Sequence, residues 1–171
     1  MRVETSCTKN EVRFELIFED DDNFKPSDKF SVGQRSAFVR SKNHDLSDIH
    51  PDLLALSAIL ICSPFVGTRL EFSEQPSSYF IEKANGILSK YKIVNSIDPS
   101  HEIEPRLGSP DSRPGLAFSG GVDSTAALAV MPGNTIPIFM DRPVSKGSLY
   151  NPDAAHQSCR ILSQLGYNSE I

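Results

Sequence analysis

Cysteine is scarce in this sequence, and the few cysteines are not paired. Cys7, Cys62 and Cys159 are far apart, odd in number and form no CxxC motif. A zinc ribbon needs closely spaced cysteines and a disulfide framework needs an even number, so the sequence favours neither. We expect reduced thiols, as in a cytosolic protein.

Long hydrophobic runs are also missing. The longest nearly apolar run, Leu53–Cys62, is well short of the roughly 20 residues that cross a bilayer. Residues 1–12 lack the apolar core that a secretory signal needs. We therefore expect a cytoplasmic protein with no membrane partner.

An excess of positive charge is the third feature that the sequence lacks. Its 17 basic and 22 acidic residues give a net charge of -5, and neither residues 1–110 nor residues 111–171 are basic overall. Sequence-independent binding to nucleic acid needs clustered lysine and arginine to replace counterions. The composition thus disfavours a nucleic-acid partner, and its 39% hydrophobic content is that of a globular protein.

Residues 1–100 predict a small α/β domain of unknown role. Polar and apolar residues alternate in the first expected strand, and Pro51 lies in the first turn of the first expected helix. The expected strands are Glu11–Phe18, Ser36–Ser41, Thr68–Phe72 and Tyr91–Ile97, and the expected helices run from Pro51 to the Ser63–Pro64 pair and from Ser77 to Tyr91.

The two expected helices differ in their apolar pattern. Apolar residues surround the first helix, which we therefore expect to be largely buried. The second is amphipathic, and its expected core residues are Tyr79 or Phe80, then Ala84, Ile87 and Leu88.

Between the first two strands lies an acidic segment, Glu19–Asn23. Such a segment can bind a hard cation or form a solvated loop. Because it lacks the glycine turn and ligand spacing of a calcium loop, the sequence favours the loop.

A second domain follows residues 101–114, which read as a linker because they are rich in proline and glycine. Residues 115–171 predict a β-α-β-α-β order, which implies a parallel sheet with crossover helices. The expected elements are a strand at Gly115–Phe118, a helix at Ser124–Met131, a strand at Thr135–Met140, a helix at Asn151–Tyr167 and a third strand that begins at Asn168.

The turn between the first strand and helix of this domain has the sequence SGGVDS, Ser119–Ser124. Gly120 and Gly121 allow backbone N–H groups to approach an anion closely. The two serines can donate hydroxyl hydrogen bonds to phosphate, and the helix N-terminus adds its positive dipole end. Asp123 suits this site if it helps to hold Mg²⁺ beside the phosphates, or if it caps the turn.

Spacing excludes two common phosphate turns. A Walker loop needs GxxxxGK followed by Ser or Thr, and no lysine follows here. A dinucleotide turn needs GxGxxG, which Gly120, Gly121 and Val122 do not provide.

The SGGVDS turn resembles the SGGxDS signature of the PP-loop, or N-type, ATP pyrophosphatases. This superfamily includes GMP synthetase, NAD synthetase, 7-cyano-7-deazaguanine synthase and tRNA-thiolation enzymes. The signature is complete at Ser119–Ser124, and the likeness covers residues 115–171. It implies a Rossmann-like (HUP-type) nucleotide-binding domain.

The resemblance also implies an activity. These enzymes bind ATP, adenylate a substrate oxygen with release of pyrophosphate, and then amidate or thiolate the substrate with release of AMP. The implied catalytic residues are Ser119, Asp123 and Ser124, and Asp123 is the implied Mg²⁺ ligand. The implied ATP-binding residues are Ala117, Phe118, Ser119, Gly120, Gly121, Val122, Asp123, Ser124, Phe139, Met140 and Asp141.

Two departures from the family limit what is expected of this chain. Cys62 lies within an apolar helix and not on a nucleophile turn, so residues 1–100 are not expected to be a glutaminase. The family's sheet usually has five parallel strands, whereas residues 115–171 supply two and the start of a third. We therefore expect either a fragment of a longer enzyme or a sheet completed by a second copy or a partner chain.

The acceptor substrate, a small molecule or tRNA, is left open, although the acidic balance disfavours tRNA. The alternative function is a non-catalytic module that binds nucleotide or another protein.

Overall fold

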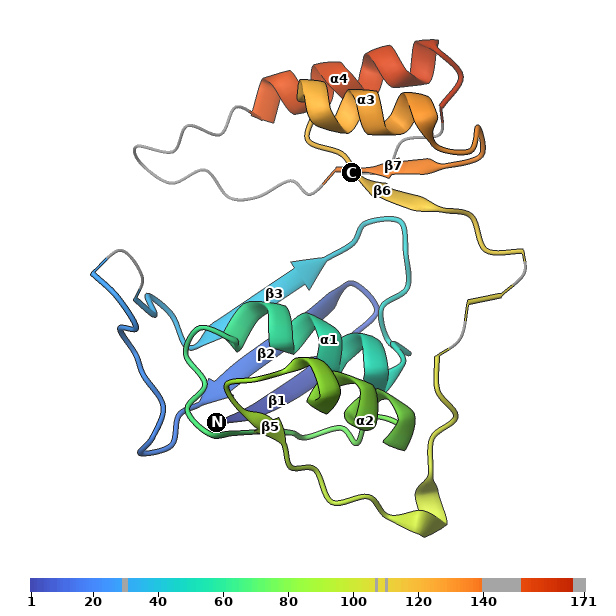
Figure 1. Ribbon diagram of the computed structural model, residues 1–171. Coiled ribbons are helices and arrows are strands. Elements are labelled where there is room, and N and C mark those ends of the chain that lie inside the picture. Colours follow the sequence, from blue (N-terminus) through green and yellow to red (C-terminus); the bar gives the residue numbers. More distant parts are fainter. Residues whose placement is uncertain (29–30, 107, 110, 140–151, 168–171) are drawn as a thin grey trace. The chain divides into compact units, whose positions relative to one another are not determined.

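The structure is a computed structural model of the 171-residue chain. It describes residues 1–28, 31–106, 108–109, 111–139 and 152–167. The chain divides into two compact units, Met1–Leu107 and Gly108–Ile171, each with its own sheet (Figure 1). Each unit also has its own cluster of buried hydrophobic residues. None of the helices among the described residues has the length and apolar character needed to cross a membrane.

The first unit contains a mixed five-stranded sheet. The β1–β2 and β2–β3 pairs are antiparallel, whereas the β1–β4 and β4–β5 pairs are parallel. In spatial order the strands are β3 (Ser36–Arg40), β2 (Glu11–Ile17), β1 (Arg2–Cys7), β4 (Arg69–Phe72) and β5 (Lys92–Ile93).

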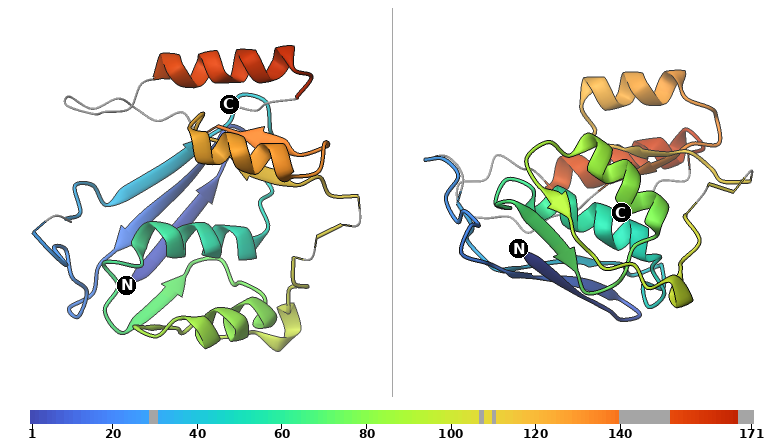
Figure 2. Two further views of the ribbon diagram at one scale, coloured as in Figure 1. Left: turned by 45° about the horizontal axis from the view of Figure 1, so that its top comes forward. Right: turned by 60° about the horizontal axis from the view of Figure 1, so that its bottom comes forward.

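Helices α1 (Pro51–Cys62) and α2 (Ser78–Ile87) lie on one face of this sheet (Figures 1 and 2). The core between them contains the buried side chains of Val3, Phe14 and Leu70. After β5 the chain passes through a short 3₁₀ turn, Pro99–His101.

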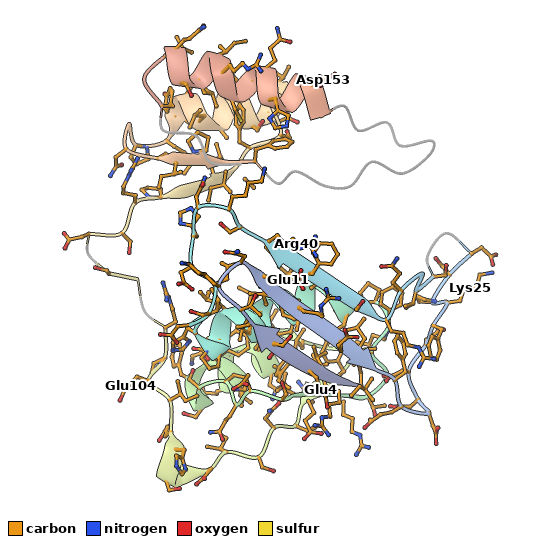
Figure 3. The ribbon with its side chains drawn as sticks, turned by 180° about the vertical axis from the view of Figure 1, so that it is seen from behind. Glu4, Glu11, Lys25, Arg40, Glu104 and Asp153 are labelled. Carbon is orange, nitrogen blue, oxygen red and sulfur yellow. The ribbon has the colours of Figure 1, made fainter. Side chains whose placement is uncertain are left out.

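The opposite face of the sheet is charged, as Figure 3 shows from behind for Glu4, Glu11 and Arg40. The Glu11 carboxylate pairs with Arg13 at 2.7 Å and with Arg40 at 2.6 Å. These hydrogen bonds, of which the one from Arg40 has the larger effect, lower the pKa of Glu11. Along β2, Val12, Phe14 and Leu16 are therefore buried on the helix side and Glu11 and Arg13 face away, as the alternation of this strand predicts.

Strand β1 is central to the sheet, yet the sequence pattern did not predict it. Apart from Met1, its apolar positions are only Val3 and Cys7, and the residues between them are polar. Val3 is completely buried because β1 is flanked by β2 and β4. Its neighbours, and not its own composition, make this segment a strand.

Two expectations about the helices were wrong. One side of α1 is exposed, with Leu60 at 76% and Leu56 at 46%, because the sheet covers the helix from one side only. Ile87 of α2 is 83% exposed, whereas Ile81 is buried, and Phe80, Ala84 and Leu88 pack against the core. The actual core face begins at Phe80 and Ile81 and continues at three- and four-residue steps, which turns Ile87 away.

Among its described residues the second unit has two parallel strands and two helices, so the fold class is α/β. Phe118, Leu128 and Leu162 form a buried cluster that joins the first strand to both helices. The predicted third strand, residues 168–171, lies outside the described residues. The elements are β6 (Gly115–Ala117), α3 (Val122–Val130), β7 (Ile136–Ile138) and α4 (Pro152–Gln164).

A buried carboxylate, Asp52, joins several parts of the first unit. It accepts hydrogen bonds from the Ser77 N–H at 2.7 Å, the Ser77 hydroxyl at 2.9 Å and the Arg106 N–H at 3.1 Å. His50 caps α1 by accepting from the Asp52 N–H, and its Nε2 donates to the Glu104 carbonyl at 3.0 Å. Asp52 and His50 thus fix the start of α1, the start of α2 and the segment at residues 104–106 together.

The buried thiol of Cys62 lies in the hydrophobic core of the first unit. Its side chain is inaccessible to solvent, and burial raises the pKa of Cys62 to about 12. A thiolate is the reactive form of cysteine, so this environment suits packing and not nucleophilic chemistry. The expectation that Cys62 is a core residue is confirmed.

Replacing Asp52 with Ala should destabilise the first unit by about 2–4 kcal/mol, because three donors would lose a buried charged acceptor. Urea unfolding followed by circular dichroism measures this change. Asp48→Ala, at an exposed position of the preceding loop, is the matched control and should change stability by less than about 0.5 kcal/mol. Equal stabilities of the two variants would show that the Asp52 contacts do not stabilise the fold.

Cys62 should resist alkylation in the folded chain. At pH 8 a thiol with a pKa of about 12 has a thiolate fraction of about 10⁻⁴, in addition to being inaccessible. Iodoacetamide labelling resolved by peptide mass spectrometry should therefore modify the half-buried Cys7 first and reach Cys62 only in denaturant. Rapid modification of Cys62 in native conditions would contradict its assignment to the core.

Candidate functional site

The SGGVDS turn connects the end of β6 to the start of α3. Hydrogen bonding to β7 continues past the end of β6, because the Phe118 N–H donates to the Ile138 carbonyl at 2.8 Å. Since β6 and β7 are parallel, both strands end at the same edge of the sheet. Ligands of open α/β sheets bind beyond this edge, so the turn lies in a suitable place.

Gly120 has a backbone conformation that favours glycine. Its φ angle is +76°, in the left-handed region, whereas Gly121 has a φ of -79° and forms the N-cap of α3. Other L-residues pay a steric cost in the left-handed region. Glycine at position 120 is therefore required by the shape of the turn.

Hydroxyl groups make hydrogen bonds within the turn. The Ser119 and Ser124 oxygens lie 3.2 Å apart, and the Gly121 N–H donates to the Ser119 hydroxyl at 3.3 Å. The Gly121 carbonyl accepts from the Ser124 hydroxyl at 3.0 Å and from the Thr125 hydroxyl at 2.9 Å. The two serines of the signature thus meet, although they are five positions apart in the sequence.

The start of α3 adds backbone donors to this arrangement. A glycine N-cap has no side chain with which to accept from the first N–H groups of a helix. Val122, the first helical residue, is 85% exposed, and Asp123 in the first turn is also exposed. An exposed helix N-terminus of this kind favours an anion through its N–H groups and its dipole.

The other predicted site residues are described in part. Ala117 is the exposed last residue of β6, and the Phe118 side chain is buried with Leu128 and Leu162. Phe139 follows β7 at the same edge of the sheet, and its side chain is buried beside Cys159. Met140 and Asp141 lie outside the described residues.

One residue beside the turn was missed by the sequence analysis. Ser158 of α4 approaches Gly120 so closely that a Cβ atom there would lie 2.6 Å from the Ser158 hydroxyl oxygen. Ser158 is next to Cys159, whose side chain is buried. The proximity of Ser158 to Gly120 depends on how α4 packs against the turn, and no local sequence pattern encodes this packing.

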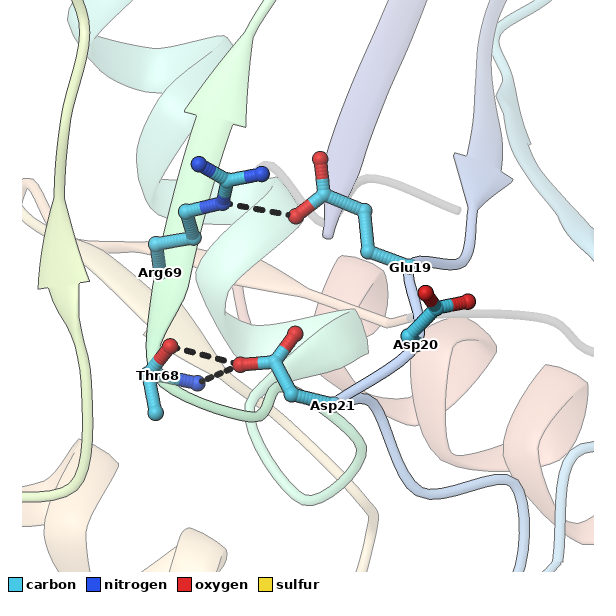
Figure 4. A pocket seen from close by; sticks show the side chains of 5 residues that line it. All are labelled: Glu19, Asp20, Asp21, Thr68 and Arg69. Carbon is cyan, nitrogen blue, oxygen red and sulfur yellow. Dashed lines mark hydrogen bonds and ion pairs between the residues drawn. The ribbon is translucent and has the colours of Figure 1, made fainter.

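The acidic segment after β2 borders an open hollow of about 560 Å³, which Figure 4 shows with Glu19, Asp21, Thr68 and Arg69. Asp21 accepts from the N–H and the hydroxyl of Thr68, and these bonds lower the pKa of Asp21. Glu19 pairs with Arg69 at 2.8 Å, which likewise lowers the pKa of Glu19.

Asp22, the last acidic residue of this segment, is also paired. Its carboxylate lies 3.1 Å from the Met1 α-ammonium and accepts from the Gly67 N–H at 2.8 Å. These carboxylates therefore connect loops, in agreement with the expected loop. Within the described part of the chain, no three acidic, histidine or cysteine residues are grouped as metal ligands.

Asp98, Ser100 and His101 form a cluster that superficially resembles a hydrolytic triad. The Ser100 hydroxyl and the Asp98 carboxylate each lie 2.9 Å from the same ring nitrogen, Nδ1 of His101. A catalytic relay needs the serine and the acid on opposite nitrogens. These three residues instead stabilise the exposed turn at Pro99–His101.

The chain was compared with protein-family models, with curated proteins and with solved structures, and it matches none of them. The chemistry of the SGGVDS turn therefore has to be inferred from its own residues and geometry.

Proposed function

We propose that the second unit binds ATP through its phosphates at Ser119–Ser124, in the manner of a PP-loop, Rossmann-like domain. In this proposal the protein adenylates a substrate oxygen and releases pyrophosphate. The observation that carries this proposal is the glycine turn after β6, in which Gly120 has a left-handed conformation and the hydroxyls of Ser119 and Ser124 lie 3.2 Å apart.

The phosphates are held by neutral donors. The backbone N–H groups at the start of α3 and the hydroxyls of Ser119 and Ser124 donate to the phosphate oxygens. No lysine or arginine occurs from Gly115 to Phe139, and Asp123 is the single acidic residue in that stretch. The turn orients the anion, and a cation is needed to neutralise its charge.

Mg²⁺ fits this requirement. It is usually held by one or two carboxylates together with substrate phosphates and water. Asp123 is exposed in the first turn of α3, beside the turn residues that would hold the phosphates. Asp123 would therefore hold the ion, which supplies positive charge to the departing pyrophosphate.

The reaction needs no nucleophilic side chain from this chain. A substrate oxygen attacks the α-phosphorus, the bond to the β-phosphate oxygen breaks, and pyrophosphate leaves with the electron pair. A nitrogen or sulfur nucleophile then displaces AMP from the substrate. The turn contributes by positioning the phosphates and by stabilising the leaving group. The nucleoside would bind beside Ala117, Phe118 and Phe139, which lie at the same edge of the sheet.

The proposed function is tested by calorimetric titration of the 171-residue chain with ATP, pyrophosphate and AMP in the presence of Mg²⁺. ATP and pyrophosphate should bind within about tenfold of each other. AMP lacks the β- and γ-phosphates and should bind at least about 100-fold more weakly, because charge-assisted bonds to those groups supply most of the affinity. Absence of ATP binding, or AMP binding equal to that of ATP, would contradict the proposal.

Gly120→Ala should weaken pyrophosphate binding by at least about tenfold. The left-handed conformation costs a non-glycine residue about 1–2 kcal/mol, and the new Cβ would lie 2.6 Å from the Ser158 oxygen. The turn must therefore change shape. Calorimetry measures the affinity, and circular dichroism shows whether the fold persists.

Gly133→Ala is the matched control for this substitution. A Cβ at Gly133, in the turn before β7, would meet no atom within 4 Å, so affinity should stay within about twofold of wild type. Wild-type affinity in Gly120→Ala would show that the observed shape of the turn is not needed for binding.

A further inference from the structure

Ser158 of α4 lies against the one glycine of the turn that has a left-handed conformation. A Cβ built on Gly120 would stand 2.6 Å from the Ser158 Oγ and 3.2 Å from its Cβ. Both values are below an ordinary van der Waals contact. The space that a side chain at position 120 would take is therefore occupied by the hydroxymethyl group of Ser158.

This contact places a third hydroxyl beside the turn. The Ser119 and Ser124 hydroxyls come from the turn and from the start of α3, whereas Ser158 reaches Gly120 from a different helix. Ser158 is partly exposed, while its neighbour Cys159 is 6% exposed and packs with Phe139. The serine therefore lies at the boundary between the packed side of α4 and the open side of the turn.

We propose that Ser158 is a phosphate-binding residue, whose hydroxyl donates to a phosphate oxygen held at Gly120 and Gly121. The inference rests on the proposed function and extends the site from one βα connection to a second helix. A phosphate group has several oxygens that accept hydrogen bonds from different directions. Donors from α3 alone approach from one side, and Ser158 supplies a donor from α4.

The contact also has a consequence for specificity. Ser158 occupies the space that a side chain at position 120 would take, and it would thus limit the size of a group held beside Gly120. A compact anion such as pyrophosphate fits this description better than an anion whose bulky substituent points toward α4. Ser158 would both donate a hydrogen bond and limit the space beside Gly120. Ser158→Ala removes only the hydroxyl oxygen and therefore separates these two roles.

The test is calorimetric titration of the full chain with inorganic pyrophosphate and Mg²⁺, for Ser158→Ala and for a matched control on the same helix. Ser158→Ala should weaken binding about tenfold, the effect of one hydrogen bond to a charged group. Ser163→Ala is the control, because the Ser163 hydroxyl donates to the Cys159 carbonyl at 3.0 Å within α4, and it should leave affinity within about twofold.

Thermal unfolding distinguishes binding from packing. If Ser158 only packs, Ser158→Ala will lower the unfolding temperature of the ligand-free chain and leave pyrophosphate affinity unchanged. If Ser158 binds phosphate, the stabilisation by pyrophosphate will be smaller in Ser158→Ala than in wild type, whatever the unfolding temperature of the ligand-free variant. Ser158→Cys keeps the shape of the side chain but has a larger and only weakly donating sulfur atom, and it should lose affinity like Ser158→Ala even if the alanine variant folds poorly.

The outcomes separate this inference from the proposed function. Wild-type affinity in both Ser158→Ala and Ser158→Cys would overturn the inference and leave the proposed function standing. Absence of pyrophosphate and ATP binding by the wild-type chain would overturn both. An equal loss in Ser158→Ala and Ser163→Ala would assign the effect to α4 in general and overturn the specific role of Ser158.

Discussion

The candidate site depends on the absence of a side chain at Gly120. Its left-handed backbone lets the chain turn from β6 into α3 within a few residues, and the lack of Cβ lets Ser158 of α4 approach. The same turn brings Ser119 and Ser124 within hydrogen-bonding distance. One position thus determines the path of the chain, the grouping of the hydroxyls and the packing of a second helix, and each of these is a condition for holding an anion with backbone donors.

The first unit is organised around a different constraint, a buried carboxylate that must be fully hydrogen-bonded. Asp52 accepts from Ser77 and Arg106 and lies at the start of α1, which His50 caps. Burial of an unpaired carboxylate is costly, so the three segments have to stay together. Residues 101–106 therefore belong structurally to the first unit, although the proline-rich composition of residues 101–114 is that of a linker.

The sequence could predict those features that depend on local chemistry. Alternation of polar and apolar residues, capping residues and glycine spacing predicted three features. These are the α/β class, the two helices of the first unit and the SGGVDS turn. β1 could not be predicted, since Val3 is buried by strands distant in the sequence. The exposed Ile87 and the approach of Ser158 to Gly120 depend on the rotation and packing of helices. The periodicity of apolar residues does not specify the rotation and packing of a helix to within one residue.

The local sequence of the turn also constrains how a phosphate ligand could be neutralised. From Gly115 to Phe139 the chain contains no lysine or arginine, so N–H and hydroxyl groups can orient phosphate oxygens but cannot cancel their charge. A helix dipole supplies only about half a positive charge. In the proposed site a divalent cation would be the simplest source of the remaining charge, and it would account for a carboxylate at Asp123 beside the phosphates. In the proposed site, the acidic residue and the lack of basic residues would thus belong to one arrangement, in which the protein provides geometry and Mg²⁺ provides charge.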